Sequence, residues 1–206
     1  MWKKKTAKRL PPEDMYKSPK DYYTYEVMQN YMHSKSMMWI QEKITKRALE
    51  LLDAEVPSLI LDLGMGCGFS TSYLYMMGYD VIGIELIYQM LVEYNIWELN
   101  PINADMKCLP LRGNTFDFII SISAFQWLIN KLDDDELSSI LKNIASVFYN
   151  LLKSKGKAVI QFYPSSDAKL QMIGRIFADY GHFKGNFIID NPQGGPKKKI
   201  YLYLEK

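Results

Sequence analysis

The stretch Leu61-Asp62-Leu63-Gly64-Met65-Gly66-Cys67-Gly68 decides the fold, because an apolar strand-like segment runs directly into three alternating glycines. Glycine lets a backbone turn tightly and approach a ligand closely, since it has no Cβ atom. A helix-like segment follows the loop, so its first N–H groups point toward whatever the loop holds. The pattern therefore predicts a strand, a loop and a helix that bind a small ligand at the loop.

The spacing of these glycines distinguishes between ligand classes. A dinucleotide-binding loop reads G-x-G-x-x-G and would need glycine at position 69, where the chain has Phe69. A phosphate-binding P-loop is disfavoured as well, because Gly-Lys-Ser/Thr does not follow. An acid followed by G-x-G-x-G resembles the cofactor loop of methyltransferases that use S-adenosylmethionine. This resemblance implies four cofactor-binding residues in the loop: Asp62, Gly64, Gly66 and Gly68.

Short apolar strands alternate with amphipathic helices from residue 34 onward, as in a parallel sheet covered by helices. The expected strands are residues 58–63, 80–85, 102–105, 116–121, 157–162, 186–190 and 199–204. The expected helices are residues 34–54, 69–77, 86–98, 133–152 and 166–180. A Pro- and Gly-rich turn instead of a helix separates the last two strands, which predicts an antiparallel hairpin. The sequence thus predicts a doubly wound α/β fold with a seven-stranded, mostly parallel sheet that ends in a hairpin.

Composition places the chain among ordinary globular proteins of one domain, with 206 residues, 48% of them apolar and 23% charged. The sequence has no run of 18 uncharged apolar residues, which argues against a membrane span. Cys67 and Cys108 are too few for a disulfide framework or a zinc cage, so no metal site is expected. Such sparse cysteine usage is typical of a reducing cytosol. We therefore expect a soluble cytoplasmic protein.

Charge is distributed unevenly along the chain, although the formal net charge is only +2. Residues 1–20 have a net charge of +5 and residues 184–206 a net charge of +3, whereas the segment between them has −6. Basic ends on an acidic body are typical of a protein that contacts a polyanion, and equally of lysine-rich termini that keep a protein soluble. We interpret residues 1–33, which lack a clear period, as a basic N-terminal arm and residues 34–206 as the methyltransferase domain.

Two acids stand at the ends of the next two expected strands. Glu85 is placed where a doubly wound fold has an acid that binds a ribose diol. In methyltransferases of this fold, an acid at the place of Asp105 accepts a hydrogen bond from the adenine amino group, and the next N–H, here of Met106, meets the ring. The alternatives are a solvated carboxylate at position 85 and a turn-forming aspartate at position 105. Because parallel strands end at one edge of a sheet, the loop and both acids are expected to share one site.

A second set of motifs lies after the fourth and fifth expected strands and near both ends of the chain. The most specific are Ser121-Ile122-Ser123-Ala124, Gln126-Trp127-Leu128 and Gln161-Phe162-Tyr163-Pro164. The others are Pro11-Pro12-Glu13 with Tyr16, Tyr31-x-x-Ser34, Arg47-Ala48-Leu49-Glu50-Leu51-Leu52 and Asp190-Asn191-Pro192. This set covers nearly the whole chain and resembles the small-subunit rRNA guanine-N7 methyltransferases of ribosome assembly. An Asn/Asp-Pro-Pro-aromatic motif, typical of methylation at amide or exocyclic amine nitrogens, does not follow the fourth strand.

The resemblance implies methyl transfer from S-adenosylmethionine to N7 of a guanine in small-subunit rRNA. Guanine N7 has a lone pair and no proton to remove, so we expect no acid–base catalyst, only positioning of this nitrogen in line with the sulfonium methyl group. Two more cofactor-binding residues are implied, Tyr31 and Ser121. The residues implied in binding the base, by stacking or hydrogen bonding, are Ser123, Gln126, Trp127, Phe162 and Tyr163. For the aromatic residues at 127 and 162, ordinary core packing is the alternative.

Members of this family act with a small zinc-binding activator that pairs with an exposed edge strand, which here corresponds to Ile102 to Asp105. The apolar residues that flank this edge are Leu91, Ile96, Trp97 and Leu99. The chain has Ser36 where the family has arginine, so the residue that binds the cofactor carboxylate stays open. Two other functions also stay open: a methyltransferase for a quinone-type or lipid-type acceptor, and an assembly factor whose binding matters more than catalysis. With rRNA as substrate, a nuclear or nucleolar location is expected in a eukaryotic cell.

Overall fold

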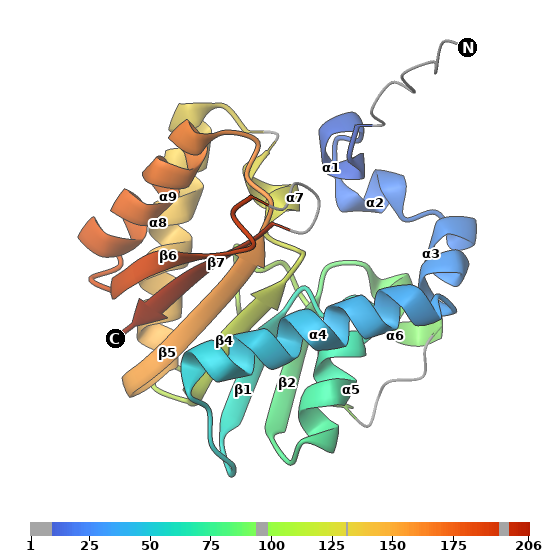
Figure 1. Cartoon of the computed structure of the whole chain (residues 1–206), viewed down its shortest axis with the longest axis horizontal. Coiled ribbons are helices and arrows are strands. Elements are labelled where there is room, and N and C mark those ends of the chain that lie inside the picture. The colour runs from blue at the N-terminus through green and yellow to red at the C-terminus, as the bar shows by residue number, and fades with distance from the viewer. Residues whose placement is uncertain (1–9, 94–98, 131, 194–197) are drawn as a thin grey trace.

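The computed structural model describes residues 10–93, 99–130, 132–193 and 198–206 of the chain. These residues form a seven-stranded sheet in the order β3-β2-β1-β4-β5-β7-β6 (Figure 1). The strands are β1 (Leu59–Leu63), β2 (Asp80–Glu85), β3 (Pro101–Asn103), β4 (Phe116–Ile122), β5 (Leu152–Phe162), β6 (Lys184–Asp190) and β7 (Lys199–Glu205). The first five run parallel, and β7 lies antiparallel between β5 and β6. The predicted doubly wound sheet with a C-terminal hairpin is confirmed.

Helices cover both faces of the sheet. They are α1 (Pro12–Met15), α2 (Pro19–Tyr22), α3 (Tyr25–Met32), α4 (Lys35–Leu52), α5 (Phe69–Met76), α6 (Tyr88–Glu93), α7 (Gln126–Ile129), α8 (Asp134–Leu151) and α9 (Asp167–Asp179). α4 and α5 pack on one face, and α8 and α9 pack on the other (Figure 1). Of the helix expected over residues 86–98, the described part is α6, and residues 94–98 lie outside the described residues. In the described part of the chain, no helix is long and apolar enough to cross a membrane.

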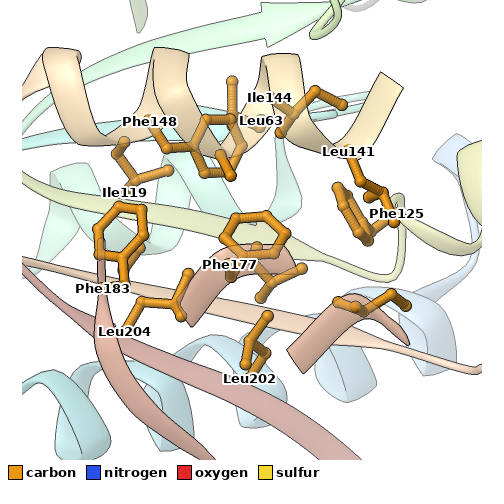
Figure 2. Close-up of a cluster of buried hydrophobic side chains, with 14 of the residues drawn as sticks. Leu63, Ile119, Phe125, Leu141, Ile144, Phe148, Phe177, Phe183, Leu202 and Leu204 are labelled. Carbon is orange, nitrogen blue, oxygen red and sulfur yellow. The ribbon is translucent and has the colours of Figure 1, made fainter. Parts of the chain in front are cut away.

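The sheet separates two hydrophobic cores, because successive side chains of a strand point to opposite faces. Ile60 of β1 joins the core beneath α4 and α5, whereas Leu61 and Leu63 join the larger core beneath α8 and α9. Figure 2 shows this larger core, in which the rings of Phe148 and Phe177 lie 6.1 Å apart between the two helices. Burial of apolar surface on both faces makes the strands a rigid support for the loops at their carboxyl ends.

Most strands lie within two residues of their expected bounds, and the differences at β3 and β5 have local reasons. β3 ends two residues earlier than expected, because the Asp105 carboxylate accepts a hydrogen bond from the Lys107 N–H (2.9 Å) and turns the chain out of the sheet. β5 begins at Leu152 instead of residue 157, and a register shift against β4 follows. This irregularity lies at the amino end of β5, opposite the edge where a doubly wound fold binds ligands.

The described part of the N-terminal arm contains three short helices, although its sequence has no clear period. Proline occupies an early position in α1 and α2, where its missing N–H has no partner to lose. Ser18 forms a capping box with Asp21, and the Thr24 hydroxyl accepts a hydrogen bond from the Val27 N–H (3.4 Å). Local capping thus defines helices that the apolar pattern does not predict. In Figure 1, α1 and α2 lie next to α7, the short helix that follows β4.

Candidate active site

The loop between β1 and α5 requires its glycines. Gly64, Gly66 and Gly68 have φ angles of +77°, +57° and +85°, a region that residues with a side chain disfavour. At Gly64, a Cβ atom would also collide with the Cβ atom of Ala124 in the loop after β4. The two loops therefore touch only because position 64 has no side chain. Gly68 stands at the N-cap of α5, so the first N–H groups of this helix face the loop.

A cavity of about 280 Å³ opens at the carboxyl edge of the sheet, near the lower end of the ~300–1,000 Å³ typical of small-molecule sites. Its wall comes from the glycine loop, the end of β2, the loops after β3 and β4, and the N-terminal helices. The sequence-predicted residues that line it are Tyr31, Gly64, Gly66, Glu85, Asp105, Met106, Ser123 and Trp127. The structure thus brings the loop and the two acids to one site, as expected for residues at the ends of parallel strands.

The Glu85 carboxylate fixes the glycine loop against the end of β2. Its Oε2 accepts a hydrogen bond from the Gly66 N–H and its Oε1 accepts one from the Ile87 N–H, both at 2.8 Å. The residue is only 6% exposed, and this burial raises the pKa of the carboxyl group above its ordinary value. Each carboxylate oxygen keeps a further lone pair, so Glu85 can accept hydrogen bonds from a ligand in the cavity.

Asp62, Gly68 and Ser121 lie behind the cavity wall and not on it. Asp62 is fully buried, and its Oδ2 accepts hydrogen bonds from the hydroxyls of Ser70 (2.5 Å) and Thr71 (2.7 Å) in α5. Its Oδ1 has no hydrogen-bond partner within the part of the chain that the structure describes, and burial raises the pKa of the group to about 6. The Ser121 hydroxyl donates to the last carbonyl of β1 (2.9 Å). The expected direct contacts of Asp62 and Ser121 with a cofactor are therefore corrected to a supporting role, whereas cofactor contact at Gly68 stays a prediction.

The loop after β3 is held at the cavity by its own side chains and by α8. Asp105 Oδ1 accepts a hydrogen bond from the Lys107 N–H (2.9 Å), and its Oδ2 lies 3.3 Å from the Lys107 ammonium group. The side chain of Asn143 in α8 donates to the Lys107 carbonyl (2.9 Å). These contacts keep Asp105 and Met106 on the cavity wall, where a partly exposed carboxylate can accept from an amino group.

The loop after β4 holds Ser123 in an uncommon backbone conformation, with φ of +55°. The Ser123 N–H donates to the Gln161 carbonyl (3.1 Å), and its hydroxyl donates to Gln161 Oε1 (2.8 Å). The Gln126 side chain donates to the Ser123 carbonyl (2.8 Å). Backbone strain of this kind persists where surrounding contacts hold it, and it clusters at functional sites. Gln126 and Gln161 thus support Ser123, and Gln126 does not line the cavity, where its side chain was expected to bind a base edge.

Phe162 and Tyr163 do not line the cavity. The expectation that Phe162 stacks on a base is wrong, because this residue is fully buried, whereas stacking by Tyr163 stays a prediction. Phe162 lies on the same face of β5 as Ile160 and is fully buried in the larger core, with its ring 5.8 Å from that of Phe125. Core packing, the alternative for this aromatic residue, therefore holds. The Tyr163 hydroxyl accepts a hydrogen bond from Lys199 Nζ (2.6 Å) at the start of β7.

The N-terminal helices place aromatic rings over the cavity beside Trp127. The rings of Tyr22 and Tyr23 lie 5.6 Å and 5.9 Å from the Trp127 ring, measured between centroids. Tyr23 also contacts Tyr31 (6.0 Å), which contacts Phe69 at the start of α5 (5.4 Å). Tyr23 and Tyr31 line the cavity, and burial raises the pKa of both phenols, so their hydroxyls stay protonated and can donate hydrogen bonds. We call Tyr22, Tyr23 and Tyr31 the tyrosine cover.

Several residues of the cavity wall were missed by the sequence analysis, because no local pattern marks them. In the N-terminal part of the chain they are Lys17, Ser18, Pro19, Tyr23 and Gln41. They reach the carboxyl edge only through the packing of α2, α3 and α4 around the cavity. The available signal was the tyrosine-rich composition of residues 16–31, since aromatic rings in a polar segment bury large areas where a surface accepts them.

Comparison with known proteins assigns the family. A family model described as "Methyltransferase domain" matches residues 61–160. The 18S rRNA (guanine-N7)-methyltransferase of Schizosaccharomyces pombe is 36% identical over 195 residues, which are 91% of this chain and 71% of that protein. The Bos taurus enzyme of the same name is 35% identical over 192 residues, 90% of this chain and 68% of that protein. This chain belongs to the 18S rRNA (guanine-N7)-methyltransferase family.

A solved structure supports the fold of this 18S rRNA (guanine-N7)-methyltransferase family member. Phosphoethanolamine N-methyltransferase 2 of Haemonchus contortus, solved with S-adenosylhomocysteine, matches with a TM-score of 0.68 at 15% identity. The match covers 91% of this chain and 58% of that one. At this identity the likeness concerns the fold alone. The family confirms the predicted cofactor class: this chain is a methyltransferase dependent on S-adenosylmethionine.

Proposed function

We propose that this protein transfers a methyl group from S-adenosylmethionine to N7 of a guanine in small-subunit rRNA during ribosome assembly. The observation that carries the proposal is one cavity lined by the glycine loop, Glu85 and Asp105 on one side and by Trp127 on the other, in a chain of this family. The protein then works where pre-ribosomal particles are assembled, which is the nucleus or nucleolus in a eukaryotic cell and the cytoplasm otherwise.

The residues present fit this cofactor. Glu85 has lone pairs left for the two ribose hydroxyls, Asp105 can accept from the adenine amino group, and the Met106 N–H stands beside it for the ring. A hydrogen bond to a charged group of this kind contributes about 1.5–3 kcal/mol. The glycine loop lets the backbone approach the amino-acid portion closely. When bound, the cofactor supplies an electrophilic methyl group on a sulfonium sulfur.

We assign Lys17 and Tyr31 to the cofactor carboxylate. Ser36, which stands where the family has arginine, is exposed and does not line the cavity. Lys17 does line it, and this lysine takes part in none of the ion pairs formed among the described residues. Lys107 also lines the cavity, but its ammonium group is already paired. An ammonium group without an acidic partner among the described residues and a buried phenol donor, both on the wall of one cavity, suit a carboxylate.

Methyl transfer to guanine N7 requires positioning and no proton transfer, because the nitrogen carries a free lone pair. Holding two reactants in line supplies about 7–11 kcal/mol of a barrier. We assign Trp127 to stacking on the guanine ring and Ser123 to hydrogen bonding at its edge. Gln126 positions Ser123, and the Tyr163 carbonyl accepts a hydrogen bond from Asn130 at the end of α7 (3.4 Å), the helix that carries Trp127. The tyrosine cover excludes water from this side of the cavity.

The edge strand β3 supports the expected zinc-binding activator as a partner. β3 pairs with β2 alone among the described strands, so its other edge is open to strand addition. A shallow hollow beside it is lined by the partly exposed side chains of Leu59, Ile82 and Ile102. An open edge next to an apolar hollow suits a partner that adds a strand and covers the hollow.

The apolar residues expected to flank this edge divide into three groups. Leu91 is almost fully buried and packs on Met65, so it supports the edge from below and does not reach a partner. Leu99 is partly exposed and packs against the same pair. Ile96 and Trp97 lie outside the described residues. Of this set, Leu99 is therefore our candidate for contact with the activator.

The test is to map N7-methylguanosine in small-subunit rRNA from cells with and without this protein. We expect one modified guanine to disappear in its absence, and unchanged methylation would refute the proposal. A Gly66→Arg variant separates catalysis from assembly, because Gly66 has positive φ and a long side chain there fills the cavity. If ribosomes mature normally with this variant but not after deletion, the assembly role dominates. Methylation of a quinone-type acceptor without RNA would select the small-molecule alternative.

A further inference from the structure

Helix α4 has an outward face that combines an exposed tryptophan with lysines. Lys35, Trp39, Lys43 and Lys46 follow one another at intervals of four, four and three residues, so they share one face of the helix. All four are exposed, and the tryptophan is 59% exposed. Lys43 Nζ lies 4.4 Å from the centroid of the Trp39 ring. We call these four residues the Trp39 ridge, which extends over about 16 Å of the helix.

The lysines of the Trp39 ridge have no acidic partner in the described part of the chain. Among the described residues, none of the three lysines forms an ion pair. Arg47 on the same helix differs, because it pairs with Glu50 (3.2 Å) and with Asp190 (3.0 Å). The lysines are therefore available for an anionic partner, and they share one helix face with a largely exposed ring that Lys43 contacts through a cation–π interaction.

The position of α4 places the Trp39 ridge beside the candidate active site. Gln41, on the inner side of the same helix, lines the cavity. Two turns further on, Arg47 holds α4 to the carboxyl end of β6 through Asp190. Figure 1 shows α4 lying across the face of the sheet, with its amino end beside α3. The ridge and Gln41 thus lie on opposite sides of one helix, whose diameter with side chains is about 10–12 Å.

We propose that the Trp39 ridge binds a single-stranded segment of RNA that flanks the methylated guanine. One base stacks on the Trp39 ring, and the three lysines bind the neighbouring phosphates. Sites for single-stranded RNA combine stacking platforms with cationic grooves in this way, whereas lysine is depleted in the interfaces of proteins with proteins. The proposal rests on the proposed function, because it takes RNA as the substrate. It adds the surface that holds the strand outside the cavity.

The test measures binding of a short, labelled single-stranded RNA to the full chain, at several salt concentrations. Trp39→Ala should weaken binding about 5- to 150-fold, as typical for loss of one stacked base, and Trp39→Phe should retain most of it. Replacing the three lysines by alanine together should make the slope of log affinity against log salt shallower by about 2, since each phosphate contact on a single strand contributes about 0.7. Tyr75→Ala is the matched control, because Tyr75 in α5 is 61% exposed and lies outside the ridge and the cavity wall.

Cofactor affinity and thermal stability of each variant show whether the chain is folded, so loss of RNA binding by a misfolded variant is recognised. The proposal is overturned if Trp39→Ala binds RNA as tightly as the Tyr75→Ala control. It is also overturned if Trp39→Ala reduces association with pre-ribosomal particles while its RNA affinity stays unchanged, which would make the ridge a protein contact. Failure of the proposed function is a separate result: the unmodified protein would then bind RNA through Trp39 but transfer no methyl group to it.

Discussion

Replacing Glu85 by glutamine removes one negative charge and one acceptor atom from the proposed cofactor site while keeping the volume of the side chain. Both carboxylate oxygens accept backbone hydrogen bonds at 2.8 Å, from Gly66 and from Ile87. An amide has only one oxygen, so one of these two N–H groups would face an NH2 group. The substitution therefore weakens both the hold on the glycine loop and the hydrogen bonds proposed for the ribose hydroxyls.

The expected effect on cofactor binding is large. Two hydrogen bonds to a charged group become neutral ones or are lost, which together weakens binding by about 2–4 kcal/mol, or roughly 30- to 1,000-fold in Kd. The effect on folding is expected to be smaller. An unpaired buried N–H costs about 1–3 kcal/mol, but burial already raises the pKa of Glu85, so removing the buried charge offsets part of this loss.

Calorimetry with S-adenosylmethionine and thermal unfolding of the same samples measure the two effects separately. Glu26→Gln is the matched control, because Glu26 is an exposed acid in α3 that does not line the cavity, and the charge change is identical. We expect the Glu26→Gln variant to bind the cofactor like the unmodified protein. If Glu85→Gln keeps its Kd within threefold of this control, the assignment of Glu85 to the ribose is refuted.

Three further substitutions test other parts of the site. Asp62→Asn should raise Tm at pH 7 and make Tm less dependent on pH. The pKa of Asp62 in the folded protein is about 6, above the ordinary 3.8, so the protonated group stabilises the fold at low pH, and this stabilisation, at most ~3 kcal/mol, is lost as pH rises through 6. A lower Tm of the variant at pH 7 in thermal scans would contradict this. Lys17→Met should raise the Kd for the cofactor about tenfold in calorimetry, whereas Lys17→Arg, which keeps the charge, should bind it about as tightly as the unmodified protein. Equal Kd values for the two variants would refute the assignment of Lys17 to the cofactor carboxylate. Trp127→Ala should lower kcat/KM for RNA about 5- to 150-fold in a methyl-transfer assay and Trp127→Phe much less, whereas equal losses would exclude stacking.

Much of the fold is predictable from sequence because it rests on local patterns. The apolar strands alternate with helices, and the Pro- and Gly-rich sequence after Asp190 has no helical pattern, so the parallel sheet and the hairpin follow directly. The glycines at 64, 66 and 68 mark positive φ angles, and all three have them. The end of β3 is not predictable in this way. The Asp105 carboxylate accepts a hydrogen bond from the Lys107 N–H and turns the chain. Whether such a turn forms in place of further strand depends on the neighbouring residues.

The candidate site is only partly predictable, because sequence position does not say which face of an element a residue occupies. The sequence around Phe162, at the end of a strand, is compatible with a ring in a pocket and with a ring in the core. Only the register of β5 in the sheet places this ring in the core. Asp62 belongs to the expected motif, yet its hydrogen bonds to Ser70 and Thr71 place it beneath the loop. Lys17 and Tyr23 reach the cavity by packing of short helices far from the loop in sequence, and no local signal encodes that contact.

The most direct test of the central claim is methyl transfer to small-subunit rRNA fragments in which guanine is replaced by 7-deazaguanine. This base has a C–H group in place of N7 and keeps the other hydrogen-bonding atoms of guanine. With the protein, the proposed activator and S-adenosylmethionine, we predict transfer to the guanine-containing fragment and none to its 7-deazaguanine counterpart. Equal transfer to both fragments would contradict the account, because the methyl group would then be going to another atom.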